Sequence, residues 1–462
     1  MTLERAGGSG ARTPYALHVP ESLGPELCEL LRPGAILERL RAECTAGAKL
    51  ESCELRHLRA HPGKDAVIAV DVRFLPEKSS SARQVSLYAR CESEATFERE
   101  VRRSDAAAIV PGQLIPEILL FPELRTVWLE FPNDSRLPHL PWIRDPKTLA
   151  KELEPELRAL VPPGWVFDAD QFAIQILRYK PERRLVSSCD SYWFVPGESS
   201  PAHISMVLRF EREDLAHTVS SITTRLREAL GTTTRLQVPR VLFAIPELEI
   251  VAMEKISGDT LASLLEGEDG VKYAERAGIR IANLHQSGAF SEEAGDTSHR
   301  LRDHAETARL LDLAAADLDL NARKIFRRLA RLEKECQAGP FGTVHGDFHP
   351  EQIVVGPDVD WLLDVEWAGW GDTTVDLGSF CAQLWMLGQR KLIADVDQFR
   401  AAFLAGYVEA SGQRVDPLGL AVATVTSILE LAAKQFRRLK ASWPKQVRRS
   451  LRECARIFDE LD

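Results

Sequence analysis

Hydrophobic and polar positions follow two different periods along the chain. In the first half, short runs alternate between apolar and polar residues and end at Gly, Pro, Asn or Asp, which predicts β-strands joined by turns. After Leu261, apolar residues recur every three or four positions instead, which predicts amphipathic helices. We therefore expect a fold of the α+β class, with a β-rich first half and a mostly helical second half.

The β-rich half contains a weak internal repeat. Residues 55–64 match residues 174–183, and each copy continues into another strand, at 84–90 and at 203–209. A helical stretch and two further strands follow in both copies. The order strand, turn, strand, turn, strand, helix and two strands therefore occurs twice, as expected of a duplicated unit. Chance similarity between two unrelated sheets with proline-containing hairpins remains the alternative.

The second half is predicted to contain eight helices, separated by short loops. They cover residues 261–265, 273–284, 304–316, 321–336, 377–392, 397–410, 418–439 and 445–461. Pro444 separates the last two, because proline removes a backbone donor and clashes inside a helix. With the repeat, these patterns divide the chain into four parts: a helical segment at 1–48, a cap at 49–165, a second β-rich part at 166–258 and a helical part at 259–462.

Composition narrows the class of partner and the compartment. The chain has 462 residues and a formal net charge of −10, which argues against nucleic acid as a partner. Its eight cysteines are dispersed without a CxxC pair, as is typical of reduced core cysteines in a cytosolic protein. We see no signal-peptide pattern and no apolar run of membrane-spanning length, so we expect a cytoplasmic protein without a membrane partner. The oligomeric state is not predictable. The basic residues at 437–440 are typical of solvated surface charge.

The candidate chemistry lies between the predicted helices 321–336 and 377–392. Asp347 follows His345 and Gly346, Gln352 comes five residues after Asp347, and Asp364 ends the apolar run 361–363. Phosphoryl transfer needs one carboxylate that orients a hydroxyl group, and an amide and a second carboxylate that hold Mg²⁺. Hard oxygen ligands of this kind are the ones Mg²⁺ prefers. Two residues beyond Asp364, Glu366 is a candidate for a second ion or its water.

Residues 261–376 resemble the aminoglycoside phosphotransferase and choline kinase-like superfamily. The resemblance rests on His345-Gly346-Asp347, His349, Gln352 and Asp364, with support from 283–285 and 371–377. It implies a bilobal protein kinase-like fold, ATP and Mg²⁺ as cofactors, and a small hydroxylated molecule as acceptor. Asp347 would be catalytic, Gln352, Asp364 and Glu366 would hold the metal, and His345 and Asp376 would support the site. Most members have Asn where this chain has Gln352. A Gln at this position resembles maltokinase-like sugar kinases and points mildly toward a sugar or polyol as the acceptor.

The resemblance also assigns roles to the two β-rich parts. The second copy would be the nucleotide-binding N-lobe, with Met253, Glu254 and Ile256 at the hinge that meets adenine. The first copy would be a duplicated N-lobe that serves as an extra cap without a catalytic lobe. Late helices would build the acceptor pocket, around Trp367, Trp370, Trp385 and Gln389. Aromatic residues at helical spacing are also typical of a core, so both interpretations stay open.

Two usual nucleotide-binding features are missing from the second copy. Met206 stands where a kinase N-lobe carries its phosphate-binding lysine, and no Gly-rich loop is present. We expect Lys180, Arg183 and Arg184 of the hairpin to supply this charge; an exposed basic turn beside a degenerate site is the alternative. The chain is accordingly either an active small-molecule kinase or a pseudokinase-like protein that binds a nucleotide or metabolite.

Overall fold

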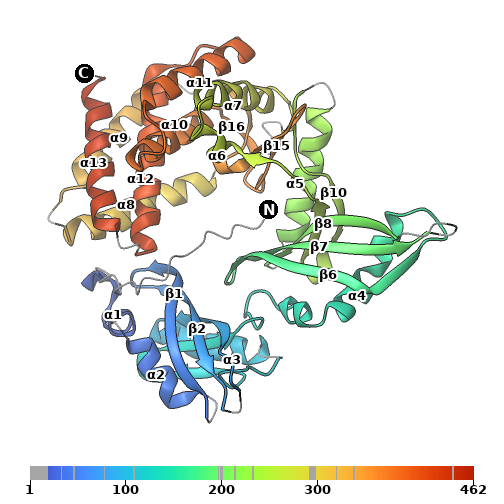
Figure 1. Ribbon diagram of the computed structural model, residues 1–462. Helices are drawn as coiled ribbons and strands as arrows, with labels where there is room; N and C mark the ends of the chain where they lie inside the picture. The colour runs from blue at the N-terminus through green and yellow to red at the C-terminus, as the bar shows by residue number, and fades with distance from the viewer. Residues whose placement is uncertain are drawn as a thin grey trace.

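The computed structural model describes most of the chain as two β-sheets and a large group of helices (Figure 1). The described residues are 19–461, except 33, 45–46, 78, 108–109, 196, 198–200, 213–214, 232–233, 291–297, 319, 337–338 and 440–441, and except the side chains of 298–304. The predicted α+β class is confirmed.

The first sheet follows two short helices, α1 (Pro25–Leu30) and α2 (Ala35–Glu43). Its five strands are antiparallel and lie in the order β1-β2-β3-β5-β4. The elements are β1 (Lys49–His61), β2 (Asp65–Leu75), β3 (Arg83–Cys91), α3 (Glu94–Ala107), β4 (Leu119–Phe121) and β5 (Thr126–Glu130). We call this sheet with α1, α2 and α3 the cap.

The second sheet has the same arrangement. Its strands lie in the order β6-β7-β8-β11-β10. As in the cap, a helix follows the third strand along the chain. The elements are α4 (Pro146–Ala159), which precedes the sheet, β6 (Val166–Lys180), β7 (Arg184–Phe194), β8 (Ala202–Glu211), α5 (Leu215–Leu230), β10 (Val241–Ile245) and β11 (Ile250–Glu254).

Strand registers show that the repeat is structural. The first hairpins close at His61 opposite Asp65 and, in the second copy, at Lys180 opposite Arg184. The later strands also agree: Leu87 faces Glu130 in the cap, and Met206 faces Glu254 in the second sheet. The two sheets therefore share the topology and the register that the sequence repeat predicts.

Among the described residues, eight helices and six short strands complete the fold. The helices are α6 (Leu261–Leu265), α7 (Gly270–His285), α8 (Ser298–Ala316), α9 (Arg323–Glu335), α10 (Thr374–Gln389), α11 (Val396–Ser411), α12 (Pro417–Arg437) and α13 (Trp443–Asp459). The strands are β9 (Leu236–Gln237), β12 (Asp259–Thr260), β13 (Phe341–Val344), β14 (Ile353–Val355), β15 (Asp360–Leu362) and β16 (Gly369–Asp372). These strands form one sheet in the order β12-β14-β15-β9 and the pair β13-β16. Pro444, which was predicted to separate the last two helices, lies in the first turn of α13, where its missing N–H costs nothing.

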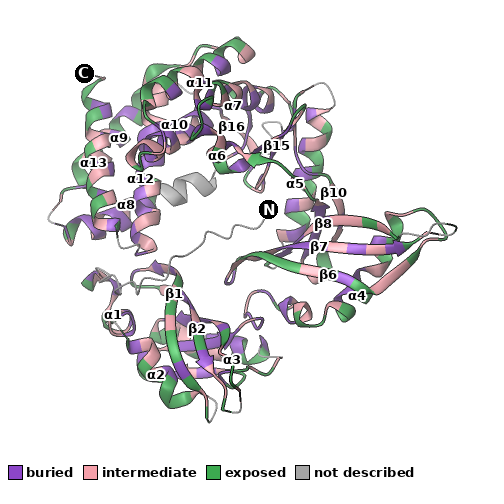
Figure 2. Ribbon diagram, viewed as in Figure 1, coloured by how far each residue is buried: buried purple, intermediate pink, exposed green. Residues whose placement is uncertain are grey.

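The cap shares a hydrophobic core with the late helices. Leu58 and Ile68 of its sheet belong to the same buried cluster as Phe436 of α12 and Trp443 of α13. A second cluster joins α7, α10 and α11, and a third joins α4 to the second sheet. Figure 2 shows buried residues along much of α10 and α12. The cap is therefore anchored on the helical part.

Helix α12 is the one described helix that is long and apolar enough to cross a membrane by length and composition alone. Half of the relevant stretch is buried inside the protein. Val425, Ile428 and Phe436 are each at most 1% exposed and belong to the core shared with the cap. Burial against protein explains the apolar composition of α12 without a membrane.

Candidate active site

A glycine with a left-handed backbone turns the chain from β13 into the candidate catalytic loop. Gly346 has φ of +88°, and a Cβ atom at this position would lie 2.7 Å from the carbonyl oxygen of Trp367. Both features exclude a larger residue without rearrangement. The turn leaves the side chain of Asp347 48% exposed, so that this carboxylate is accessible to a substrate.

Asp376 braces the catalytic loop from the first turn of α10. It is fully buried, and its carboxylate accepts the backbone N–H groups of His345 (2.7 Å) and Gly346 (3.0 Å). Its Oδ2 atom also lies 3.2 Å from Nε2 of His285, a residue at the end of α7. A carboxylate that accepts several such bonds fixes the backbone conformation of the loop.

The imidazole of His345 connects the loop of Asp347 to the loop of Asp364. Its Nε2–H donates to the carbonyl of Leu363 over 3.0 Å, and its Nδ1 accepts the N–H of Asp347 over 3.2 Å. These two partners define the tautomer, because one ring nitrogen must donate and the other must accept. The ring is fully buried, so the bridge is protected from water. It holds the two candidate carboxylates at a set relative position.

Gln352 and Asp364 are brought together by the β14–β15 pair. Ile353 faces Leu362 across this pair, and the N–H of Leu363 donates to the carbonyl of Gln352 over 2.8 Å. Asp364 follows directly with φ of 54°, a left-handed conformation that Asp tolerates better than most residues. Such conformations concentrate at functional sites.

Two arginines of the second sheet hold the carboxylates of Asp364 and Glu366. Arg184 places one Nη 2.8 Å from Asp364 and the other 2.5 Å from Glu366. Arg209 lies 3.7 Å from Asp364 and 3.6 Å from Glu366. The two guanidinium groups thus supply positive charge to both carboxylates, although the buried Oε2 of Glu366 forms no hydrogen bond with the described residues. The charge of Arg184, against the opposing effect of burial, keeps the pKa of Asp364 below its usual value.

The residues present fit a magnesium ion shared with a substrate. The described part of the chain contains no group of three or more His, Cys, Asp or Glu that could bind a metal by itself. Mg²⁺ usually takes one or two carboxylates and completes its shell with waters and substrate phosphates. Asp364 and Glu366 would provide the carboxylates. The Gln352 amide makes no side-chain hydrogen bond with the described residues, so its oxygen is available.

Position 206 lies on the wrong face of β8 to reach this site. Met206 is fully buried in the core of the second sheet with Leu208 and Phe210. Side chains of a strand alternate between faces, so Arg209 points the other way, toward Asp364. The cation that the third strand directs toward the catalytic loop is therefore Arg209, which we did not predict.

The expected hinge residues end the β11 strand. Met253 is buried against α5, and Glu254 accepts the N–H of Arg240 (2.7 Å) and an Nη of Arg227 (3.0 Å). Ile256 lies just beyond the strand, and its backbone forms no hydrogen bond with the described residues. Of the three, Ile256 therefore has the backbone groups that remain available to an adenine.

The cap holds the tip of the β6–β7 hairpin. Glu182 lies at this tip with φ of 60° and is 4% exposed. Its carboxylate accepts hydrogen bonds from Arg90 (2.5 Å) and Arg59 (3.4 Å), both of the cap. Its backbone N–H donates to Asp134 over 2.9 Å, and Asp134 also accepts the Tyr179 hydroxyl over 2.7 Å. We call these five residues the hairpin clamp.

The hairpin clamp and the contact with Asp364 use equivalent positions on the third strand of the two sheets. Arg90 faces Val67 in the cap, and Arg209 faces Val186 in the second sheet, so the two arginines are equivalent in the repeat. Arg209 meets carboxylates of the catalytic part, whereas Arg90 meets Glu182. The cap sheet thus contacts the hairpin through one of its faces. The equivalent face of the second sheet contacts the catalytic loop.

Lys180 and Arg183 of the same hairpin have lowered pKa values. Burial and then the charge of Arg184 lower the pKa of Lys180 to about 7. Burial and then the charge of Arg59 lower the pKa of Arg183 to about 10. Arg183 nevertheless remains exposed to solvent. Neither residue forms an ion pair with the described residues, which leaves both available to an anion.

The three tryptophans proposed for an acceptor pocket differ in how far they are buried. Trp385 is 7% exposed and belongs to the core that α10 shares with the cap. Trp367 is 52% exposed, and its backbone lies against Gly346 of the catalytic loop. Trp370 is half-buried, as is Gln389 at the end of α10. Of these three tryptophans, Trp367 is the exposed one.

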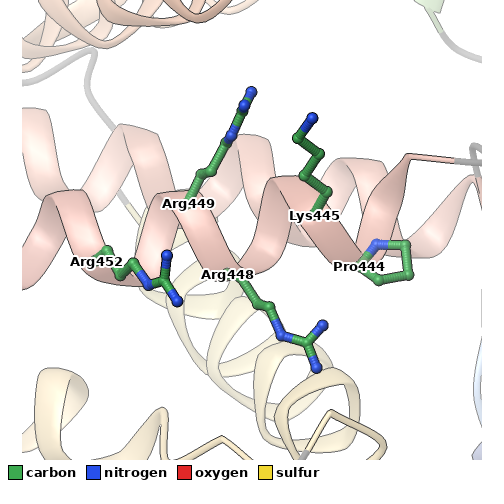
Figure 3. Close-up of a pocket in the computed structure, with 5 residues that line it drawn as sticks. All are labelled: Pro444, Lys445, Arg448, Arg449 and Arg452. Atoms are coloured by element: carbon green, nitrogen blue, oxygen red, sulfur yellow. The ribbon is translucent and has the colours of Figure 1, made fainter.

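A separate hollow of about 510 Å³ lies on α13, lined by Pro444 and four basic residues. In Figure 3, Lys445 and Arg449 point to one side of the helix, and Arg448 and Arg452 point to the other. Arg448 donates to the carbonyl of Leu318 over 3.2 Å. No residue of the catalytic loop lines this hollow, so it is distinct from the site around Asp347.

Comparison with known protein families gives a match over half of the chain. A model of the family described as "Phosphotransferase enzyme family" matches residues 187–418, which is half of the chain. A search of curated proteins finds no match.

Solved structures of small-molecule kinases also align with the chain. A choline/ethanolamine kinase family protein from Mesorhizobium loti has 16% identity and a TM-score of 0.41, over 66% of this chain and 93% of that one. Choline kinase from Cryptosporidium parvum has 10% identity and a TM-score of 0.46, over 67% and 96%. An amicoumacin kinase in complex with AMP-PNP and Ca²⁺ has 13% identity and a TM-score of 0.42, over 66% and 92%.

Proposed function

The chain belongs to the phosphotransferase enzyme family, and we propose that it transfers the γ-phosphate of ATP to a hydroxyl group of a small molecule in the presence of Mg²⁺. It is a small-molecule phosphotransferase with a hydroxyl acceptor. We expect it to act in the cytoplasm, where ATP is available. Gln352, which resembles its counterpart in maltokinase-like kinases, favours a sugar or polyol acceptor.

The observation that carries this proposal is the bridge through His345. One imidazole ties the loop of Asp347 to the loop of Asp364, and Gln352 is tied to the same loop through Leu363. Asp347 is accessible and accepts the hydrogen bond of the acceptor hydroxyl, which it orients in line with the phosphate. Mg²⁺, when bound at Asp364 and Gln352, neutralises charge on the phosphates.

The second sheet contributes the cations of the donor site. Lys180 and Arg183 face the phosphates from the hairpin, while Arg184 exchanges its carboxylate partners for phosphate oxygens when the donor arrives. Arg209 stays paired with Glu211, its close partner at 2.7 Å, and sets the position of the carboxylates. This chain thus supplies positive charge without a Gly-rich loop.

A pseudokinase-like binding protein is the second candidate, and the ion pairs of Arg184 favour it. In that case Arg184 would permanently close the metal site formed by Asp364 and Glu366. Thermal unfolding in the presence and absence of MgATP tests nucleotide binding, which both candidates require. We expect MgATP at about 100 times its Kd to stabilise the protein by about 2.7 kcal/mol.

Turnover completes this test. ADP release is measured with sugars, their phosphate esters, amino alcohols and aminoglycosides as acceptors. Acceptor-dependent ADP release supports the kinase. A protein that binds MgATP but releases no ADP with any acceptor would be the pseudokinase. A protein with neither a thermal shift nor turnover would contradict both candidates.

We expect the hairpin clamp to control ATP binding. Arg90→Met removes the strongest cap contact of Glu182 and leaves this buried carboxylate to Arg59 alone. Because small displacements of positioning groups are costly, KM for ATP should rise about tenfold, with a smaller change in kcat. Steady-state kinetics at varied ATP measure this split. Arg56→Ala, which removes an exposed cap arginine paired with Asp71, is the control and should leave KM unchanged.

ATP affinity should also depend on pH through Lys180. The pKa of the Lys180 amine is about 7. The charged groups that act on it are Arg178, Arg183, Arg184 and Asp364. A bound triphosphate favours the protonated amine, so binding takes up a proton when the free protein has lost it. Between pH 7 and 9, Kd for MgATP should therefore rise with pH, at most about tenfold per unit. Titration calorimetry checks this, and Lys180→Met should bind more weakly with a flat profile over the same range.

A further inference from the structure

A lysine side chain spans two strands of the second sheet. Lys255 directly follows β11, and its Nζ donates to the Oγ of Ser188 on β7 over 2.8 Å. In the sheet, β8 lies between these two strands. Neighbouring strands are about 4.8 Å apart, so β11 and β7 are roughly 10 Å apart and the two side chains meet over β8. We call this contact the lysine bridge.

Strand register shows which face of the sheet carries the lysine bridge. Ser188 is directly opposite Val207 of β8, and directly opposed residues point to the same face. Val207 and Arg209 are two residues apart, so they share this face, and Arg209 lies 3.7 Å from Asp364. The lysine bridge therefore lies on the face that is turned toward the catalytic loop, about 7 Å along β8 from Arg209.

The two ends of this face have different roles in the proposed donor site. Arg184, which contacts Asp364 and Glu366, marks the phosphate end. Ile256, whose backbone groups are available to an adenine, marks the base end and is the residue next to Lys255. A nucleotide that extends between the two ends would therefore place its base over β8, beside Ile256.

The sheet beneath the lysine bridge has the apolar character that a base needs. Val207 and Val186, which is directly opposite Arg209, are both half-buried on this face. Small-molecule sites are mostly apolar with a few polar groups, and a bound base would bury the two valines. In the free protein, the side chain of Lys255 must pass over Val207 to reach Ser188. The lysine bridge thus occupies space that the base would take.

Local contacts stabilise the lysine bridge in the free protein. Ser188 is 4% exposed, so its hydroxyl has little access to water as a replacement partner. Asp190 lies two residues along β7 on the same face and provides a counter-charge to the amine. Against the opposing effect of burial, hydrogen bonds from Ser205 and His203 and then the charge of Lys255 keep the pKa of Asp190 below its usual value. A ligand must therefore break a charge-assisted hydrogen bond to displace Lys255.

We propose that Lys255 and Ser188 form an autoinhibitory contact, which closes the base end of the donor site in the free protein and opens when a nucleotide binds. The proposal rests on the proposed function, because it concerns the same donor site. Arg184 covers the phosphate end through its pairs with Asp364 and Glu366. A nucleotide must then displace one cation at each end, and Lys255 turns toward solvent.

Adenosine tests the base end by itself, because it carries no phosphate. In titration calorimetry on the full chain, Lys255→Met should bind adenosine about 3- to 10-fold more tightly than the wild type, since no hydrogen bond has to be broken. Inorganic tripolyphosphate occupies only the phosphate end, and both proteins should bind it within about twofold of each other. Unchanged, weaker or absent adenosine binding by Lys255→Met would overturn the proposal. So would a loss of tripolyphosphate affinity, because Lys255 would then be a phosphate ligand.

A double-mutant cycle shows whether Lys255 acts through Ser188. In a Ser188→Ala background, Lys255→Met should have no further effect on adenosine affinity, as expected of two residues that share one contact. Ser187→Ala alters the neighbouring serine on the opposite face of β7, and Lys272→Met removes an exposed lysine paired with Asp269. Both are matched controls and should leave adenosine affinity within about twofold. Additive effects of Lys255→Met and Ser188→Ala would contradict the proposed contact.

The chemical reactivity of the Lys255 amine gives a second measurement. Reductive methylation of the wild type, followed by mass spectrometry, gives the rate at which this amine is modified. AMP-PNP with Mg²⁺ should increase that rate, because the amine leaves Ser188 for solvent. A lysine that binds the nucleotide would be protected instead, and protection would overturn the proposal.

These measurements separate the autoinhibitory contact from the proposed function. If adenosine binds as expected but no acceptor is phosphorylated, the contact stands and the kinase activity fails. If ADP release depends on an acceptor but Lys255→Met leaves adenosine affinity unchanged, the kinase stands and the contact fails. If neither protein binds adenosine or MgATP, both proposals are wrong.

Discussion

Asp347→Asn should lower kcat by about 10²- to 10⁴-fold and leave MgATP binding intact. The asparagine keeps the size of the side chain but cannot take a proton from the acceptor hydroxyl. The loop should keep its conformation, because the contacts that hold it involve the backbone of residues 345–347 and the carboxylate of Asp376. Single-turnover measurement of phosphate transfer, with ATP binding measured separately, distinguishes the two effects.

Glu351→Gln is the matched control for this change. Glu351 is an exposed carboxylate four residues along, and the same loss of charge there should leave kcat within about twofold. If Asp347→Asn retained wild-type kcat, the acceptor hydroxyl would have to be oriented by another group. His349, whose Nε2 lies 3.9 Å from Asp347, would be the first residue to examine.

Asp364→Asn should remove the response of the enzyme to Mg²⁺. Asparagine accepts the left-handed backbone that Asp364 adopts, so the loop should fold normally. The metal would lose one anionic ligand, and Arg184 and Arg209 would keep only Glu366 as a partner in the catalytic part. Loss of one preorganised electrostatic contact typically costs about 10²- to 10³-fold in rate, and we expect a decrease of that size at physiological Mg²⁺.

The rate is measured as a function of Mg²⁺ at saturating ATP. The half-saturating concentration should rise strongly in Asp364→Asn and stay unchanged in Asp358→Asn, which alters an exposed carboxylate between β14 and β15. Equal Mg²⁺ dependence in the wild type and Asp364→Asn would mean that Asp364 does not bind the metal and that its role is limited to its pairs with the arginines.

The features that sequence predicted are those with a local cause. Strand period and helix spacing depend on neighbouring residues, and they agree with the structure, as does a helix start at Pro444. The repeat was also accessible, because its matched hairpins keep the same register in both sheets. The candidate motif was visible because Asp347, Gln352 and Asp364 lie close together along the chain, connected by a single strand pair.

The features that sequence did not predict depend on contacts between distant segments. Arg184 and Asp364 are paired across two parts of the chain, and nothing near either residue indicates its partner. Arg209 was missed because the strand was compared at position 206, whose side chain points into the opposite core. Glu182 lies in the hairpin for which sequence indicated roles only for Lys180, Arg183 and Arg184, yet it is the residue by which the cap holds the hairpin.

These contacts change the role of the cap. Its sheet is anchored on α12 and α13 through a shared core, and its arginines reach across to the hairpin of the second sheet. The cap thereby connects the element that carries Lys180 and Arg183 to the part that carries Asp347. A duplicated sheet without a catalytic lobe of its own thus has a physical function, because it restricts the position of the hairpin relative to the catalytic loop.

A crystal structure with Mg²⁺ and AMP-PNP tests the central claim most directly. Our account predicts a metal ion bound by Asp364 and the amide oxygen of Gln352, with Lys180, Arg183 and Arg184 at the phosphates and the γ-phosphate facing Asp347. Arg184 should have left Glu366 for a phosphate oxygen. A structure in which Arg184 keeps both carboxylates, with no metal between Gln352 and Asp364, would contradict it.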